Sequence, residues 1–327
     1  MDINNSVDEV TKFPRYVELQ TTTLCNSFCS ICPYGLVEGR FEKLTMSDEL
    51  INKILDECEK HKDEIHNIIP YVNNEPFIDK RMVDILRNIK RRDLRVELST
   101  NGSCLTEEIA RAIVDERLID DFRISFFAAE KEDYNQLMPR LNYEHVCKNI
   151  RYFSDYNKSK GSPIHANMIM ILVENLDMQE NIDKVEKMFD IKVRPFGYLD
   201  RAGANEKKNK LLDEEELLVD KLVGCSTRRP NEWCSILANG DVYLCTQDWY
   251  RENKIDSVAN KSIEEVWNSE NYKRYRDIIF GKADVPKDFI CTKCKIAIYR
   301  KEGETKNKLN FAGDKYVDKD GKKNVKF

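Results

Sequence analysis

The chain has 327 residues, of which 41 % are hydrophobic and 34 % charged, and its formal net charge is −5. Positive and negative residues alternate along the chain, so no basic stripe is available to follow a phosphate backbone, and nucleic acid is not expected as a partner. The N-terminal residues carry no signal-peptide pattern, and no apolar run reaches the roughly 18 residues that a membrane span needs. We therefore expect a cytoplasmic protein without membrane association, in a compartment where thiols stay reduced.

Strand-like apolar runs alternate with helix-like stripes through the first 200 residues. The expected strands are 16–21, 68–72, 94–100, 122–127, 165–173 and 192–199. The expected helices begin after Ser47, near Met82 and after Thr106, and two more lie near 143–156 and 178–189. Six such units favour parallel strands with right-handed crossovers, but they are too few to close an eight-stranded barrel. The sequence therefore predicts an α/β fold, a partial (βα)6 barrel of the TIM type with its active site at the carboxyl ends of the strands.

The pattern changes after residue 200, and we expect four regions. The predicted barrel covers 1–200, a charged linker and helix cover 201–224, a small domain covers 225–299, and a charged tail covers 300–327. Five of the eleven cysteines lie in the small domain, for which the sequence predicts a β-hairpin and a helix.

Three cysteines, Cys25, Cys29 and Cys32, lie within eight residues of the loop after the first expected strand. Iron–sulfur clusters are held by thiolates, and a cubane cluster normally takes four. Three thiolates leave one iron open to an outside ligand, as in catalytic metal sites generally. A zinc site would need a second pair of ligands, and none lies between residues 33 and 57. The spacing therefore favours an iron–sulfur cluster over zinc or over three ordinary buried cysteines.

The run Cys25-x-x-x-Cys29-x-x-Cys32 after a first strand resembles the signature of the radical S-adenosylmethionine (radical SAM) enzymes. The resemblance implies a 4Fe–4S cluster whose open iron binds S-adenosylmethionine, and a 5′-deoxyadenosyl radical released on one-electron reduction. It also implies a low-potential electron donor such as flavodoxin or ferredoxin.

Other stretches match the family at the expected strand ends. The run NNEP at 73–76 lies where the family usually has Gly-Gly-Glu-Pro, a motif that holds the methionine amino group, so the resemblance implies cofactor contacts from Asn74 and Glu75. Asparagine is the residue after glycine best able to adopt positive φ, so the turn can survive the change. Asn101 and Ser125 end the next two strands, where the family often contacts ribose and carboxylate. Ordinary turn and strand chemistry is the alternative for both.

A second group of cysteines follows a hairpin signal at Asn239-Gly240. Cys245 ends the hairpin, and the run CTKC supplies Cys291 and Cys294. The arrangement resembles the SPASM extension of radical SAM enzymes, which opens with a cysteine, then 9–15 residues, then Gly-x-x-x-x-Cys. No cysteine follows Cys294, so the resemblance is to the shorter form, the twitch domain, which implies one auxiliary 4Fe–4S cluster on four cysteines. A structural zinc ribbon is the alternative.

The fourth ligand of this group has two candidates. Cys225 satisfies the family interval before Gly240, whereas Cys234 is too close to that glycine. A two-residue hairpin loop would nevertheless place Cys234 directly across from Cys245, so it stays a rival to the favoured Cys225.

Two clusters together predict an oxidation, because an auxiliary cluster can accept the electron left on a substrate radical. The arrangement resembles that of the twitch-domain aminocyclitol dehydrogenases of butirosin biosynthesis, in which a substrate-contacting arginine follows the last barrel strand. Arg201, in the run Asp200-Arg201-Ala202-Gly203, matches that place, and a surface arginine in a charged linker is the alternative. The sequence predicts an oxidoreductase that acts on a small hydroxylated or amino-bearing molecule, in secondary metabolite biosynthesis.

Two other functions stay open at this point. A radical SAM maturase would crosslink, oxidise or epimerise a precursor peptide, but only 24 residues precede Cys25, where many maturases carry a peptide-recognition domain. A non-catalytic zinc or electron-transfer protein is the third possibility. The sequence does not identify the substrate, because pocket specificity depends on a few side chains at strand ends and loops.

Overall fold

The computed structural model describes residues 8–173, 176–199, 201–205, 221–300 and 310–311. Most of the predicted linker and its helix, Asp200, and nearly all of the predicted tail lie outside these residues.

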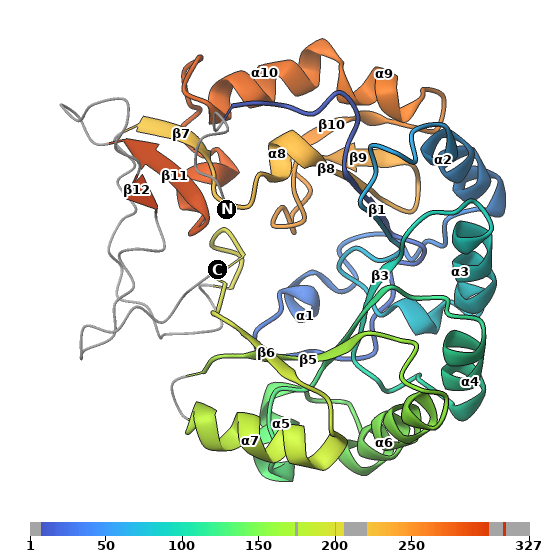
Figure 1. The fold of residues 1–327 in the computed structure, drawn as a ribbon. Coiled ribbons are helices and arrows are strands. Elements are labelled where there is room, and N and C mark those ends of the chain that lie inside the picture. Colours follow the sequence, from blue (N-terminus) through green and yellow to red (C-terminus); the bar gives the residue numbers. More distant parts are fainter. Residues whose placement is uncertain (1–7, 174–175, 200, 206–220, 301–309, 312–327) are drawn as a thin grey trace.

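Six parallel strands form the inner layer of an open arc (Figure 1). They are β1 (Tyr16–Leu19), β2 (Asn67–Ile69), β3 (Glu97–Thr100), β4 (Asp121–Ser125), β5 (Ala166–Ile171) and β6 (Val193–Phe196). β1 pairs with β2, β3 to β6 pair in chain order, and a parallel bridge between Ile68 and Val96 joins the two groups. The strands therefore follow one another around a partial barrel, which confirms the predicted fold.

Helices cover the outside of the arc (Figure 1). They are α2 (Asp48–Lys60), α3 (Met82–Lys90), α4 (Glu107–Asp115), α5 (Lys131–Leu137), α6 (Tyr143–Ser159) and α7 (Met178–Phe189). The hydroxyls of Ser47 and Thr106 accept the first free amides of α2 and α4, as the sequence predicts. Two short helices, α1 (Tyr34–Val37) and the 3-10 helix η1 (Pro76–Ile78), lie in loops at the carboxyl ends of the strands.

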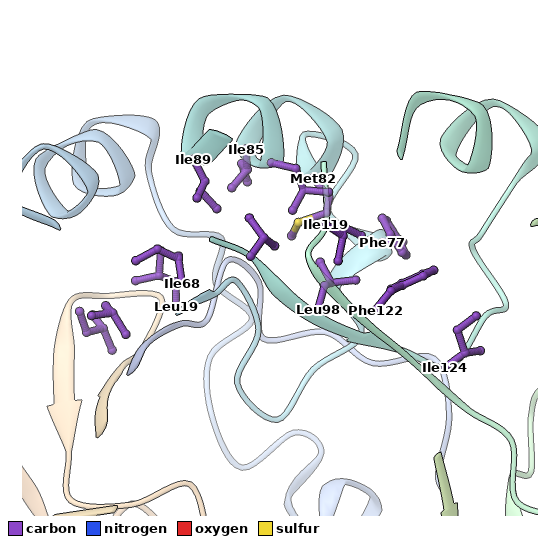
Figure 2. Packing of buried hydrophobic residues seen from close by; sticks show 14 of the residues in the cluster. Leu19, Ile68, Phe77, Met82, Ile85, Ile89, Leu98, Ile119, Phe122 and Ile124 are labelled. Carbon is purple, nitrogen blue, oxygen red and sulfur yellow. The ribbon is translucent and has the colours of Figure 1, made fainter. Parts of the chain in front are cut away.

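The main core lies between the strands and this outer layer of helices (Figure 2). Side chains alternate along each strand, so Leu98 and Phe122 point outward into the core while Glu97 and Arg123 point into the barrel. Arg123 Nη1 lies 2.7 Å from Glu97 Oε1. Burial raises the pKa of Glu97 to about 7, with the Arg123 charge opposing it. Part of the barrel interior is therefore filled by ion pairs, where closed barrels stack aliphatic side chains.

In the described residues, the C-terminal region adds three strands to the barrel sheet, one separate three-stranded sheet, three α-helices and a 3-10 helix. Its elements are β7 (Lys221–Cys225), α8 (Arg229–Glu232), β8 (Trp233–Ile236), β9 (Asp241–Tyr243), β10 (Lys254–Ser257), α9 (Ile263–Trp267), α10 (Glu270–Ile279), the 3-10 helix η2 (Ile290–Lys293), β11 (Ala297–Arg300) and β12 (Asn310–Phe311). β8 pairs in parallel with β1, giving the strand order β10-β9-β8-β1-β2. The hairpin therefore extends the barrel sheet at its first strand, which the sequence did not predict.

The hairpin loop differs from the sequence prediction by one residue. Leu237 N donates to Asp241 O at 2.8 Å, so the loop holds three residues, 238–240, and Gly240 takes a φ of +86°. Ser235 pairs with Tyr243, and the same register places Leu244, not Cys245, opposite Cys234. The prediction that Cys234 faces Cys245 was wrong because the extra loop residue moves the two cysteines out of register, and a one-residue shift reverses the face on which a side chain lies.

No helix in the described ranges is both long and apolar enough to cross a membrane.

Truncating a core side chain should test the packing of strands against helices. Leu98 is fully buried, so we expect Leu98→Ala to lower the free energy of unfolding by about 2–5 kcal/mol through lost burial and a cavity. Leu36 is 38 % exposed, and Leu36→Ala should change it by less than about 0.5 kcal/mol. Urea unfolding followed by circular dichroism gives both values, and equal values would contradict the assigned core.

Candidate active site

The first cysteine loop follows β1 at the carboxyl ends of the parallel strands. Cys32 N donates to Cys29 O at 3.0 Å, and Cys25 N donates to the Tyr34 hydroxyl at 2.9 Å, so the loop is folded back on itself. Burial raises the pKa of the Cys25 thiol, and charge on Cys29 and Cys32 would raise it further. The three thiols are therefore close neighbours, and a cation among them would favour their ionised form.

This donor set fits an iron–sulfur cluster better than one metal ion. In the described part of the chain, no three Cys, His, Asp or Glu side chains converge as ligands of a single ion. A cubane takes its thiolates on separate irons, so the ligands of one cluster need not converge on a point. Ser27 Oγ, 3.2 Å from Cys29 Sγ, adds a polar neighbour to one of the thiols.

The NNEP run keeps the turn that glycine usually makes. Asn73 has a φ of +55°, as expected of asparagine, and the Asn74 side-chain oxygen accepts a bond from Val72 N at 2.8 Å. Glu75 N donates to Leu24 O at 2.9 Å, which fixes the run against the cysteine loop. The turn therefore lies beside the three thiols.

The Glu75 side chain faces the protein. It is 2 % exposed and accepts bonds from Thr100 Oγ1 at 2.7 Å, Asn101 N at 2.8 Å and Phe77 N at 3.2 Å. Burial raises the pKa of Glu75 to about 7, against these hydrogen bonds. The carboxylate thus joins the ends of β2 and β3.

Asn101 and Ser125 lie where the sequence places them, at the ends of β3 and β4. The Asn101 amide nitrogen donates to Asn26 Oδ1 at 2.9 Å, and its oxygen accepts from Ser103 Oγ at 2.6 Å. Asn101 therefore connects β3 to the cysteine loop. Ser125 is the half-buried last residue of β4.

The segment 201–205 lies over the cysteine loop. Arg201, Ala202 and Gly203 all have positive φ, of +57°, +52° and +82°. This left-handed turn lets Ala204 pack beside Tyr34 and lets Asn205 Nδ2 donate to Ile31 O at 2.8 Å. Arg201 Nε is buried and has no hydrogen-bond partner within the described ranges. The structure thus places Arg201 near the predicted site with a free donor.

The second cysteine group forms where β7, the hairpin and η2 meet. β7 ends at Cys225 and pairs with β11, so Ala297 lies beside it and the preceding Cys294 is brought close. Burial raises the pKa of Cys291, and charges on Cys294, Cys225 and Cys245 raise it further. The structure therefore brings together the four cysteines that the SPASM resemblance implies.

Cys234 lies apart from this group. It is fully buried in the main core, next to its strand partner Val17. Charge on the Cys234 thiol would raise the pKa of Cys58, on α2. The pKa of Cys234 itself is raised by burial and by the charges of Glu18 and Glu57, and Arg276 opposes this. The placement favours Cys225 over Cys234 as the fourth ligand.

A pocket with an enclosed volume of about 60 Å³ and an open mouth lies between the two cysteine loops. One wall comes from the first loop and α1 and the other from the residues after β9. The side chains that line it include Leu24, Tyr34, Glu38, Phe41, Glu42, Lys43, Asn73, Cys245, Thr246, Asp248, Trp249 and Arg251. Asn73 Nδ2 donates to Thr246 O at 3.2 Å and so links the NNEP turn to the second loop. Cys245 is the one predicted cluster ligand on the lining, so the pocket borders the second cysteine group.

Comparisons with known proteins agree with this geometry. Residues 19–185, just over half of the chain, match the model described as the Radical SAM superfamily. The chain belongs to the radical SAM superfamily. Residues 225–295 match the SPASM model, described as an iron-sulfur cluster-binding domain. The protein is therefore an enzyme whose family implies a 4Fe–4S cluster, S-adenosylmethionine and auxiliary iron–sulfur binding, and the third possibility above, a non-catalytic protein, is set aside.

Individual relatives resemble parts of this radical SAM enzyme. A tungsten-containing aldehyde ferredoxin oxidoreductase cofactor-modifying protein of Pyrococcus furiosus is 33 % identical over 101 residues, 31 % of this chain and 28 % of that protein. Among solved structures, SuiB of Streptococcus suis bound to precursor peptide SuiA is 15 % identical with a TM-score of 0.66, covering 87 % of this chain and 70 % of that one. BtrN in complex with AdoMet and 2-DOIA is 17 % identical with a TM-score of 0.50, covering 86 % and 92 %. At these identities the structural likeness is one of fold.

Sequence reasoning missed several residues that shape the site. Tyr34, which holds the Cys25 amide, and Asn205, which reaches Ile31, carry no signal in the sequence. Arg251 and Trp249 also line the pocket without belonging to a motif.

Replacing Cys225 and Cys234 separately should identify the fourth ligand. The reconstituted protein should hold about eight irons per chain, two cubanes' worth. We expect Cys225→Ala to lose about half of this iron, whereas Cys234→Ala should keep it, because its thiol lies in the core. Iron analysis with Mössbauer spectra gives the result, and loss of iron from Cys234→Ala alone would reverse the assignment.

Proposed function

We propose that this enzyme is an oxidoreductase that dehydrogenates a small hydroxylated or amino-bearing molecule in the pocket between its two cysteine loops. The observation that carries the proposal is the lining of that pocket, which includes Leu24 and Tyr34 from the first loop and Cys245 and Thr246 from the second. A substrate bound there is close to both the site of hydrogen removal and an electron acceptor.

The cysteines divide into two ligand sets in this proposal. Cys25, Cys29 and Cys32 hold the cluster that binds S-adenosylmethionine, and Cys225, Cys245, Cys291 and Cys294 hold one auxiliary 4Fe–4S cluster. When bound, these groups supply a 5′-deoxyadenosyl radical that removes a hydrogen atom from the substrate, and an acceptor for the remaining electron. A proton leaves with that electron, so the substrate loses two hydrogens in all. A low-potential donor such as flavodoxin or ferredoxin, in the cytoplasm, would supply the first electron.

The chain offers carboxylates for that proton. Asp248 is committed to the backbone amides of Glu252 at 3.0 Å and Asn253 at 2.7 Å. Glu38 and Glu42 are exposed at the pocket and can accept a proton. Arg201 is the further substrate contact that the sequence proposes, and its unpartnered Nε supports that role.

A small molecule is proposed because the enclosed space between the two loops is only about 60 Å³, enough for a small chemical group, and the rest of the pocket is open to solvent. A precursor peptide is the other candidate, and a protein of similar fold, SuiB, was solved with one. Deuterium-labelled small molecules and peptides can be incubated separately with the enzyme. The class that transfers deuterium into 5′-deoxyadenosine is the substrate class.

Cleavage of S-adenosylmethionine tests the first ligand set. The reduced, reconstituted protein should form 5′-deoxyadenosine under anaerobic conditions, and Cys29→Ala should abolish this while keeping the auxiliary iron. Cys147, a small buried residue on α6, serves as the control, and Cys147→Ala should retain cleavage. Chromatography of the products measures both, and cleavage by Cys29→Ala would refute the assignment.

A buried arginine lies beside the auxiliary ligands. Arg229 Nη2 pairs with Glu18, and its guanidinium lies 4.5 Å from the centre of the Trp233 ring. The Arg229 charge interacts electrostatically with the thiols of Cys245 and Cys225. The Arg229 Nε is buried without a hydrogen-bond partner in the described residues. A fixed positive charge here favours the reduced, more negative form of a cluster.

Removing that charge should make the auxiliary cluster harder to reduce. We expect the double variant Arg229→Met/Glu18→Gln to have a midpoint potential on the order of 50–100 mV below that of Glu18→Gln alone, because the two differ only in the arginine charge. Arg228, whose Nε lies 2.8 Å from Glu232 Oε1, is the control, and Arg228→Met should shift it much less. Redox titration followed by electron paramagnetic resonance measures the shift, and equal potentials in all variants would contradict the role.

A further inference from the structure

Arg251 lies on the wall of the pocket, and among the described residues no carboxylate is within ion-pair distance of it. Its guanidinium lies 4.1 Å from the centre of the Phe41 ring, across the pocket mouth from the first cysteine loop. Within the described ranges it has no ion pair within 4.0 Å and no side-chain hydrogen bond. The side chain is half-buried, and the face of the Phe41 ring is the contact that the described residues offer in place of its lost hydration.

The carboxylates nearest to Arg251 already have other partners. Asp241 lies 2.6 Å from Lys254 Nζ, and Asp248 accepts backbone amides. Burial lowers the pKa of the Arg251 guanidinium, although Asp241, Asp248 and Tyr243 oppose the effect. Burial of a charge without a close partner costs free energy, which a bound anion would recover.

The backbone at Arg251 carries a second cost. Its φ is +59°, in the left-handed region that is unfavourable for an L-residue. The turn is held by Arg251 N, which donates to Asp248 O at 3.2 Å. Strained positions of this kind persist where the surrounding structure fixes them, and they cluster at ligand sites. The turn therefore holds the Arg251 guanidinium at the pocket wall.

The other pocket charges indicate which anion fits. Lys43 is a second cation on the lining, whereas Glu38 and Glu42 place negative charge at the same mouth. These carboxylates would repel a doubly charged phosphate more strongly than a single carboxylate. The fork of an arginine matches a carboxylate with two parallel hydrogen bonds, and the Tyr34, Phe41 and Trp249 rings offer apolar contact beside it.

We propose that Arg251 binds a carboxylate group of the substrate, so the substrate class is a small organic acid with an apolar or aromatic body. The inference rests on the proposed function only in taking the bound acid to be the substrate. The binding preference itself can be measured without turnover.

Three probes that share one ring and differ in charge test this inference. Phenylacetate carries the carboxylate, phenylacetamide is its neutral counterpart, and 2-phenylethylamine carries a cation. With the reconstituted full chain and bound S-adenosylmethionine, calorimetry should show phenylacetate binding about tenfold or more tightly than phenylacetamide at low salt, and the amine more weakly than phenylacetate.

Variants assign the preference to one side chain. Arg251→Gln should bind phenylacetate and phenylacetamide equally, and Arg251→Lys should recover only part of the preference because it lacks the planar fork. Arg40 is the matched control, since it lies over the Phe41 and Tyr250 rings at 5.9 and 4.8 Å but does not line the pocket. Arg40→Gln should keep the preference, and iron content and the visible spectrum show that each variant is loaded.

Two results would overturn the inference. One is equal binding of phenylacetate and phenylacetamide by the unaltered protein, and the other is a full preference retained by Arg251→Gln. Failure of the proposed function is recognised separately, because it would leave the carboxylate preference intact while no organic acid transfers deuterium into 5′-deoxyadenosine.

Discussion

The arrangement of the site depends on β1 being paired along both edges. On one side β1 pairs with β2, and on the other with β8, in both cases in parallel. Because parallel strands end at the same edge of a sheet, this pairing brings the loop after β1, with Cys25, and the chain after β9, with Cys245, to one end of the barrel. The β8 pairing therefore helps to fix the distance between the two cysteine groups.

Asparagine side chains hold the loops at this edge together. Asn101 bonds to Asn26, Asn73 to Thr246 and Asn205 to Ile31, each across more than sixty positions of sequence. An amide can donate and accept at once and is short enough to fix the backbone closely. At 73, the family's usual glycine would allow the same turn but could not reach the second loop. The substitution therefore adds a connection between the two halves of the site.

Local sequence signals predicted much of this structure, whereas the features that depend on pairing between distant segments could not be predicted. The caps Ser47 and Thr106 and the parallel order of the barrel followed from nearest neighbours and periodicity. The hairpin loop was predicted one residue too short, because Asn-Gly suits both two-residue and three-residue loops. Only the register of the two strands, which leaves Ala238 in the loop, distinguishes them. The direction of the Glu75 carboxylate depends on β3, which no motif of its own run could show.

The charges inside the arc divide by depth. Arg123 and Arg229 lie on the inner side of the sheet and each meets a carboxylate, of Glu97 and Glu18 respectively, as buried charges usually do. Arg251 lies at the open edge and lacks an ion pair in the part of the chain that the structure describes. Arg276, which is also buried, donates instead to the backbone carbonyls of Pro230 and Trp267, so each of these deeper arginines has a polar acceptor. The counter-ion of Arg251 is therefore expected to be part of the ligand, so the protein predicts a substrate with a negative charge.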